Sequence, residues 1–332
     1  MEQARFAQNA HNVQSWRLRL EGDGSLVGGL DPGRLLPETD PLSRQLVLSL
    51  GAFTEAARRA AAVAGYHLDA EWIAPDSWSA SESPGADLFR FTLQQRLPVS
   101  DQVLDGLTAA TAKYLLDPAT LSPDTARELE QRYTGPGLRV IVEQETQRVR
   151  DSADLAIGAF AVEMRHEPTL MESFELTRLG RRARRLEPWG LSLGASFGRF
   201  AFRFVDPITA AFPQDPQQFA DSGIALFSET VAPTSSVIVM TTDGNEPATW
   251  FVAGQALQAL WMDVRSAGLE LLPLSQGLQE YPEAAEFYEQ LHQLWAREGQ
   301  TVQMLMMIGR PRARATPSPR IPASELFDLG EV

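Results

Sequence analysis

Two amide side chains stand close together near the start of the chain, in the run His11-Asn12-Val13-Gln14-Ser15-Trp16. Each amide carries both a carbonyl acceptor and an NH₂ donor. Two amides spaced two residues apart, just before an alternating run at 15–20, could pair with the donor–acceptor edge of a flavin or nucleotide ring. The alternative interpretation is a capped turn that leaves Trp16 in the core.

A second candidate for ligand binding, Arg320, lies in a tail at 310–322 that is rich in Pro and Arg. The apolar run 301–308 before it predicts a buried strand. A guanidinium on a rigid extended tail can bind a phosphate bidentately. The tail therefore predicts a phosphate contact, and a solvated basic tail is the alternative.

A third candidate is the glycine-rich stretch 190–198, which fits the Gly-x-Ser-x-Gly pattern at both Ser192 and Ser196. A nucleophile elbow requires a strand before the serine and a helix after it. Here an Arg-rich helix precedes the stretch and a strand-like run follows it. Asp263 and His292 would complete the order Ser…Asp…His, but both lie on expected packing helices. A serine hydrolase is therefore a minor alternative.

The composition excludes other chemistry. The 332 residues include no cysteine and four widely spaced histidines, so we expect no disulfide, no cysteine nucleophile and no metal site. The net charge of −14 argues against nucleic-acid binding, which requires a basic footprint. No apolar run reaches about 18 residues, and the first residues lack a secretory h-region. We expect a cytoplasmic protein that contacts neither membrane nor nucleic acid.

Two long helices should position these residues. Asp40-Pro41 predicts the start of a helix at 41–64, with Gly65 at its end, and a second helix is expected at 248–267, ended by Gly268. Gly51 precedes Gly65 by the same fourteen residues that separate Gly254 from Gly268. This correspondence arises either by chance or from a diverged duplication whose two helices pack closely through small residues.

Taken together, the motifs resemble the nitroreductase family of flavoproteins, specifically its fused, double-length bacterial branch, the mycobacterial Acg-like proteins. The matching segments occur in order over nearly the whole chain, with a weak match between about 100 and 235. They are the opening His11–Trp16, then Leu36–Arg44 (Leu-Pro-x-Thr-Asp-Pro-x-x-Arg), Gly254–Leu269 followed by Pro273–Gln276, and Thr316–Pro322 (Thr-Pro-x-x-Arg-x-Pro).

The resemblance implies an α+β nitroreductase-like fold with two related halves. Each half would have a central, mainly antiparallel sheet flanked by helices, and the two would pack as an internal pseudo-dimer. We place the first half at 1–85 and the second at 86–332, with the extended tail at its end. Because family dimers place flavin at the subunit interface, a fused chain could remain monomeric.

The resemblance also implies FMN as cofactor, with NAD(P)H as hydride donor and a small nitroaromatic or quinone as acceptor. The flavin N5 would do the chemistry, so no catalytic side chain is expected. Asn12 and Gln14 would face the ring, the backbone around Ser275 and Gln276 would lie near N5, and Arg320 would hold the phosphate. The full set of expected cofactor-binding residues is His11, Asn12, Gln14, Arg96, Ser275, Gln276 and Arg320.

Two positions depart from the family pattern. Ser15 replaces the proline before Trp16, and the family segment Arg-Arg-Thr-x-Arg is here Thr92-Leu93-Gln94-Gln95-Arg96, which keeps Arg96 alone. Lost charge-assisted contacts weaken binding by roughly 1.5–3 kcal/mol each. The departures leave open a catalytically weak or inactive relative that binds or sequesters flavin, or that serves as an interaction module.

Overall fold

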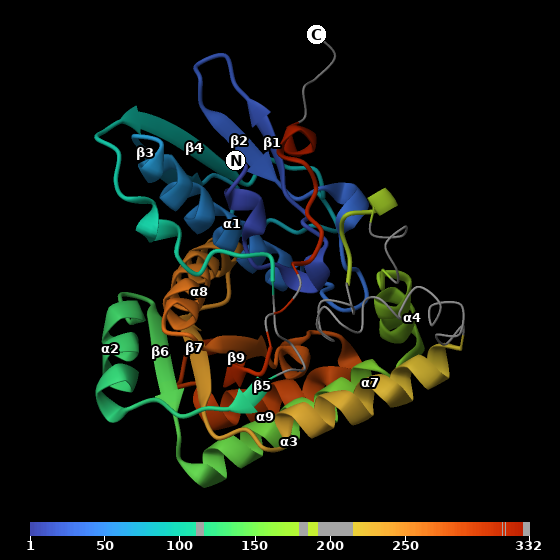
Figure 1. Ribbon diagram of the computed structural model, residues 1–332. Coiled ribbons are helices and arrows are strands. Elements are labelled where there is room, and N and C mark those ends of the chain that lie inside the picture. Colours follow the sequence, from blue (N-terminus) through green and yellow to red (C-terminus); the bar gives the residue numbers. More distant parts are fainter. Residues whose placement is uncertain (111–115, 179–184, 192–214, 314, 316, 328–332) are drawn as a thin grey trace.

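A computed structural model describes residues 1–110, 116–178, 185–191, 215–313, 315 and 317–327. The described chain is α+β, with two antiparallel sheets, as predicted. Figure 1 shows them at opposite ends of the molecule, with α1 (Arg44–Val63) and α8 (Pro247–Ser266) between them. The helix pair is therefore the part of the fold that joins the two sheets.

The first sheet has the strand order β1-β2-β4-β3. Its strands are β1 (Arg17–Leu20), β2 (Leu26–Gly29), β3 (Tyr66–Trp72) and β4 (Phe89–Gln95). Along β3, Leu68 is buried while the neighbouring His67 and Asp69 are exposed, so one face packs inward and the other meets solvent. The predicted boundary at 85/86 falls between β3 and β4, which pair along their whole length.

The second sheet has the order β5-β9-β7-β6, and β8 also pairs with β9. Its strands are β5 (Leu116–Pro118), β6 (Leu138–Glu143), β7 (Val237–Asp243), β8 (Glu270–Pro273) and β9 (Gln300–Pro311). β7 and β9 are buried over most of their length, and β9 confirms the buried strand predicted at 301–308. Strands covered on both faces are continuously apolar rather than alternating.

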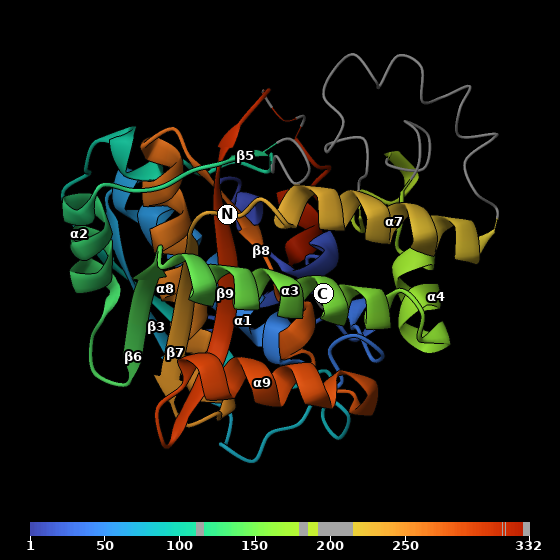
Figure 2. The same ribbon diagram turned by 90° about the horizontal axis from the view of Figure 1, so that it is seen from below.

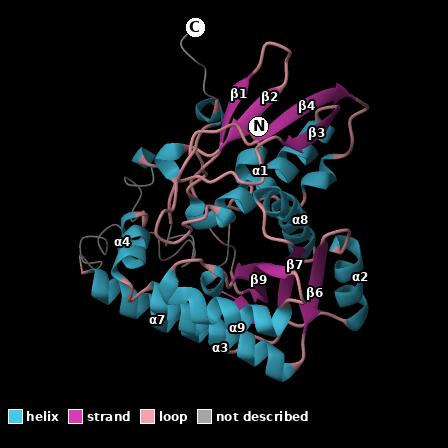
Figure 3. Ribbon diagram, turned by 180° about the vertical axis from the view of Figure 1, so that it is seen from behind, coloured by secondary structure: helices cyan, strands magenta, loops and turns pink. Residues whose placement is uncertain are grey.

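Helices cover the outer face of the second sheet (Figures 2 and 3). The long helices there are α3 (Thr146–Glu163), α7 (Pro216–Val231) and α9 (Ala285–Trp295). α2 (Pro123–Tyr133) packs beside β6, and α4 (Glu167–Glu175) contacts α7. None of the described helices is both long and apolar enough to cross a membrane.

The central helices pack closely through glycines, as the duplication alternative expects. A Cβ atom at Gly51 would collide with the Phe251 carbonyl oxygen, and one at Gly254 would collide with that of Leu48. The predicted helix start was wrong, because α1 begins at Arg44 rather than Pro41. Ser43 is left-handed (φ 59°), so the chain turns before the helix, although the Asp40 carboxylate still caps it.

Candidate functional site

A cleft of about 1270 Å³, part of it open to solvent, lies beside the helix pair. Its walls come from both ends of the chain: residues 8–12 and the first turns of α1 on one side, and α8, β8 and the following segment on the other. Among the described lining residues Arg320 is the only arginine or lysine, and none is Asp or Glu. The cleft is therefore suited to an anionic ligand with an apolar body.

Five of the seven predicted binding residues line this cleft: His11, Asn12, Ser275, Gln276 and Arg320. Gln14 is fully buried, and its amide bonds to the segments around the cleft. Arg96 lies elsewhere. It is exposed just after β4, where its backbone N–H donates to Gly65 and its guanidinium to Gln94 Oε1 at 3.3 Å. The structure thus brings the two ends of the chain together without Arg96.

The opening motif has a strained backbone. His11, Asn12 and Gln14 have φ values of 45°, 54° and 51°, and only one other described non-glycine residue, Ser43, is left-handed. Such conformations cost about 1–2 kcal/mol for residues with a Cβ. Strain of this kind persists where surrounding contacts impose it, and it concentrates at ligand sites.

The predicted amides are used to join segments at the rim of the cleft. Asn12 Nδ2 donates to the carbonyls of Gly190 (3.1 Å) and Pro319 (3.3 Å). Gln14 Nε2 donates to Pro188 O at 2.8 Å, and Gln14 Oε1 accepts from Ile321 N at 2.9 Å. The two side chains therefore fasten three parts of the chain to one another.

Arg320 is partly buried, and no described carboxylate pairs with it. Its Nε donates to Arg5 O (2.8 Å), Nη1 to Asn12 Oδ1 and Pro319 O, and Nη2 to Ala7 O. Burial, with Arg265 and Arg5 nearby, lowers its pKa to about 9. Burying a cation without a counter-charge is costly. An anion in the cleft would supply that charge, and one Nη2 hydrogen has no described partner.

Three glutamines that line the cleft each keep a buried amide atom without a described hydrogen-bond partner. These atoms are Gln45 Nε2, Gln276 Oε1 and Gln279 Oε1. Gln279 is oriented by Glu163, whose Oε2 accepts from its Nε2 at 2.9 Å. Buried polar atoms are normally paired, so one donor and two acceptors remain in the walls of the cleft.

Several lining residues were not predicted from the sequence. Gln45 and Ser49 lie four residues apart on α1, and Ser49 Oγ accepts from Ala10 N at 3.0 Å. Two polar residues four apart in an otherwise apolar helix share one face, and this pattern could have identified Gln45 and Ser49 as candidate cleft residues. Phe160 and Phe227, stacked at 4.4 Å, come from the middle of the chain, where no motif pointed to them.

The described residues give no support to a serine hydrolase. Ser192 and Ser196 lie outside them. Asp263 accepts from Tyr133 Oη and Arg132, both at 2.6 Å. His292 uses both ring nitrogens, one toward Tyr288 O (2.7 Å) and one toward Val302 N (3.0 Å), and burial lowers its pKa. In the same part of the chain no group of three His, Cys, Asp or Glu could hold a metal.

Comparisons with known proteins give structural likenesses only. No protein-family model matches the chain. No curated protein matches it. Among solved structures it is similar to an FMN-bound nitroreductase from Desulfitobacterium hafniense, at 13% identity and a TM-score of 0.40 over 70% of this chain and 100% of that one.

Two further structures are similar at comparable levels. The FMN- and NADPH-dependent nitroreductase NfnB from Sphigopyxis sp. strain HMH shares 15% identity, with a TM-score of 0.40 over 68% of this chain and 98% of that one. An NADPH:FMN oxidoreductase from Vibrio harveyi, complexed with NAD⁺, shares 10%, with a TM-score of 0.38 over 70% and 78%.

Proposed function

We propose that this chain binds FMN in the cleft and acts as a nitroreductase-like oxidoreductase that takes hydride from NAD(P)H and reduces a small acceptor of nitroaromatic or quinone type. One observation supports this above all. The cleft joins the opening motif, the segment around Ser275 and Gln276, and Arg320, which are the segments that carry the resemblance to the family.

The residues of the cleft fit this cofactor. FMN has a phosphate, a ring edge that alternates donors and acceptors, and apolar ring faces. Arg320 supplies a partly buried cation that no described carboxylate neutralises. The unpaired amide atoms of Gln45, Gln276 and Gln279 supply one donor and two acceptors. Leu257, Trp261 and Met304 supply apolar surface.

The protein would bind and orient the cofactor, and the flavin, when bound, would exchange hydride and electrons. Arg320 would hold the phosphate end, while the segment at Ser275 and Gln276 would form a wall against the ring. Phe160 and Phe227 would exclude water from the apolar end of the cleft. No described side chain is required as nucleophile or metal ligand.

The chain organisation is part of the same proposal. The two sheets on either side of α1 and α8 would be the cores of two related halves, as in the fused branch of the family. The helix pair would then form internally the contact that two subunits form in ordinary members. We expect a monomer, which light scattering would test.

Absorption spectra and FMN titration of the purified protein test this function. We expect flavin bands near 370 and 450 nm in the isolated or FMN-supplemented protein, and oxidation of NADPH or NADH with a quinone acceptor. Arg320→Met should weaken FMN binding, whereas Arg96→Met, outside the cleft, should leave it unchanged. A colourless protein that binds no added FMN would overturn the proposal.

A flavin-binding protein with weak turnover is the second candidate, because the amides of Asn12 and Gln14 are already occupied by Gly190, Pro188, Pro319 and Ile321. The amide groups expected to bind the flavin ring therefore already form hydrogen bonds within the protein. Bound FMN that NADPH and NADH both fail to reduce would favour this candidate. Rapid turnover with a quinone would exclude it.

A further inference from the structure

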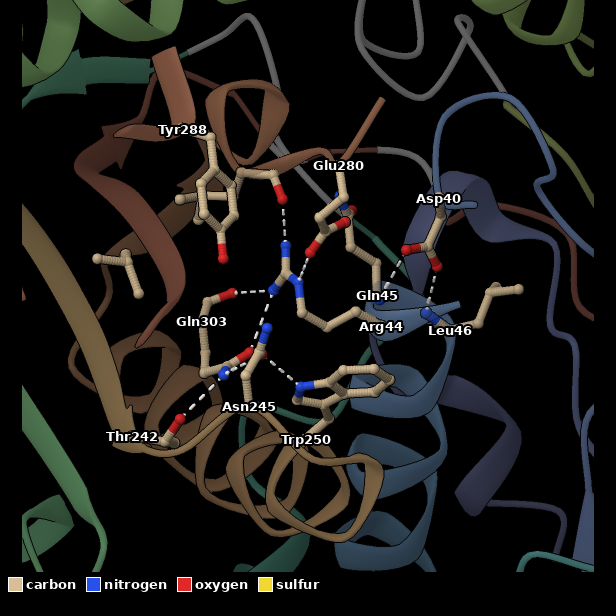
Figure 4. A network of polar contacts seen from close by, with 12 residues as sticks. Asp40, Arg44, Gln45, Leu46, Thr242, Asn245, Trp250, Glu280, Tyr288 and Gln303 are labelled. Carbon is tan, nitrogen blue, oxygen red and sulfur yellow. Dashed lines mark hydrogen bonds and ion pairs between the residues drawn. The ribbon is translucent and has the colours of Figure 1, made fainter. Parts of the chain in front are cut away.

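Arg44 is a fully buried arginine at the start of α1. Figure 4 shows its guanidinium among residues from the second half of the chain. Nε pairs with Glu280, Nη2 donates to Leu278 O, and Nη1 donates to Gln303 O (2.9 Å) and Gln303 Oε1 (3.2 Å). One side chain at the start of α1 thus holds two segments from the C-terminal part of the chain, 278–280 and Gln303.

These contacts continue beyond Arg44. Gln303 Nε2 donates to Thr242 Oγ1 at 2.9 Å and to Asn245 Oδ1 at 3.2 Å. Asn245 Oδ1 also accepts from Trp250 Nε1 at 2.7 Å. The guanidinium is therefore anchored, through Gln303, to the ends of β7 and β9 and to the first turn of α8. Such anchoring gives Arg44 a defined position in the fold.

The segment that Arg44 holds is a wall of the cleft. Gln276–Leu278 form a single 3-10 turn, with backbone bonds of 3.0 Å from Leu278 N to Ser275 O and 3.3 Å from Gln279 N to Gln276 O. One such turn has little stability of its own. Ser275, Gln276 and Gln279 line the cleft on one side of the segment, while Leu278 O and Glu280 meet Arg44 on the other.

The opposite wall starts at the residue next to Arg44. Gln45 lines the cleft from α1, and its backbone N–H donates to Asp40 Oδ1 at 3.1 Å. The guanidinium of Arg44, the residue before Gln45 on α1, therefore links the side of the cleft at Gln45 to the segment that carries Gln276. No covalent connection nearby does this, because Arg44 and Glu280 are 236 residues apart.

We propose that Arg44 is a positioning residue, which holds the segment 276–280 against the start of α1 and thereby sets the cleft walls that contact the ligand ring. This inference rests on the proposed function for the identity of the ring. The geometry requires an arginine, because a planar fork reaches Glu280, Leu278 and Gln303 together. A lysine would keep the charge and lose most of these bonds.

Hydrogen exchange on the flavin-free protein tests the positioning directly. In Arg44→Met we expect the amides of Leu278 and Gln279 to accelerate at least tenfold more than those of β3, which report the loss of global stability. Arg44→Lys should give an intermediate value. Leu68→Ala is the matched control, since it removes buried volume from the first sheet, away from the cleft. Equal acceleration at 278–279 in that control would overturn the proposal.

A second measurement uses bound FMN. We expect Arg44→Met to change the visible circular dichroism of the flavin and to weaken its binding about tenfold or more, because the segment that contacts the ring would lose its fixed position. Leu68→Ala should keep the wild-type spectrum. If Arg44→Met does not fold, Glu280→Gln removes the charge at nearly constant volume and should show the same changes to a smaller degree. Wild-type exchange rates and spectrum in both variants would disprove the inference.

The two measurements separate the inference from the function on which it rests. If the wild-type protein binds no FMN, the proposed function fails, and the exchange rates alone decide whether Arg44 positions the segment 276–280. If FMN binds and neither the exchange rates nor the spectrum responds to Arg44, the function stands and the positioning role is wrong.

Discussion

Arg44, which is fully buried, and Arg320, which is partly buried and lines the cleft, lie in opposite electrostatic surroundings. Arg44 pairs with Glu280 and has Asp40 nearby; burial alone would lower its pKa, but the two carboxylates outweigh burial and raise it. Arg320 has only neutral oxygen partners among the described residues. Burial and the neighbouring Arg265 and Arg5 all lower its pKa, to about 9.

The difference assigns different roles to the same residue type. A buried charge that finds its counter-charge inside the protein is complete without a ligand. A partly buried charge whose partners are all carbonyl oxygens keeps an uncompensated field, which a bound anion would neutralise. We therefore expect Arg44 to stabilise the walls of the cleft and Arg320 to contact a bound anion.

The largest expected effect is on stability. Arg44→Met leaves Glu280 without its partner and should lower the free energy of unfolding by about 3–5 kcal/mol, the usual cost of breaking a buried pair. Urea unfolding followed by tryptophan fluorescence measures it. A double variant, Arg44→Met with Glu280→Met, should recover part of the loss, because it removes both charges. A loss below 1 kcal/mol in the single variant would contradict the stabilising role of Arg44.

The second effect is on affinity for the phosphate. Arg320→Met should weaken FMN binding by roughly 1.5–3 kcal/mol, the range for a charge-assisted bond, and should leave riboflavin binding nearly unchanged. Calorimetric titration with both flavins measures the ratio. Arg44→Lys should weaken both flavins alike, since it acts on the wall rather than on the phosphate. An FMN-to-riboflavin ratio that Arg320→Met leaves intact would remove Arg320 from the phosphate site.

The third effect is a pH dependence centred on Asp40. Burial raises the pKa of its carboxyl to about 7, Glu280 adds to the rise, and Arg44 opposes it. Because the folded pKa exceeds the unfolded value, the contribution to stability is full below about pH 4 and is lost as the pH rises through 7. Between pH 5 and 7 the free energy of unfolding should fall by up to about 2.7 kcal/mol, at 1.36 kcal/mol per unit.

Asp40→Asn should flatten that part of the pH profile, which thermal or urea unfolding at several pH values measures. Glu172, whose pKa burial also raises, contributes a slope of the same sign, so Glu172→Gln is the matched control. An unchanged slope in Asp40→Asn would show that Asp40 stays ionised beside Arg44. In that case Arg44 would be neutralised by two carboxylates rather than one.

The sequence supports prediction where the determining contacts are local or repeated. The fourteen-residue glycine spacing raised the close packing of α1 and α8 as one of two alternatives, and an apolar run predicted β9. The motifs at the two ends of the chain contained five residues that share one cleft. In each case a local pattern in the sequence indicates the structure that those residues form.

What could not be predicted depends on partners far apart in the chain. Nothing next to Arg44 indicates Glu280, and an arginine at a helix start has an ordinary solvated alternative. Phe160 and Phe227 look like core residues until the fold places them against the cleft. Arg96 matched a motif, yet the position just after β4 takes it to the surface. Pairing of this kind is decided by tertiary packing.

The smallest expected effect is the stabilisation of the flavin-free protein by inorganic phosphate, which should depend on Arg320 and not on Arg44. Inorganic phosphate should bind beside Arg320 and stabilise the wild-type protein by about 1 kcal/mol when its concentration exceeds the dissociation constant several-fold. Chloride at equal ionic strength controls for screening. Arg320→Met should lose this stabilisation, whereas Arg44→Lys should keep it, because Arg44 already has Glu280. Thermal unfolding measures the shift. Equal stabilisation of wild type and Arg320→Met would mean that phosphate binds elsewhere, and the contrast between the two arginines would then lose its functional meaning.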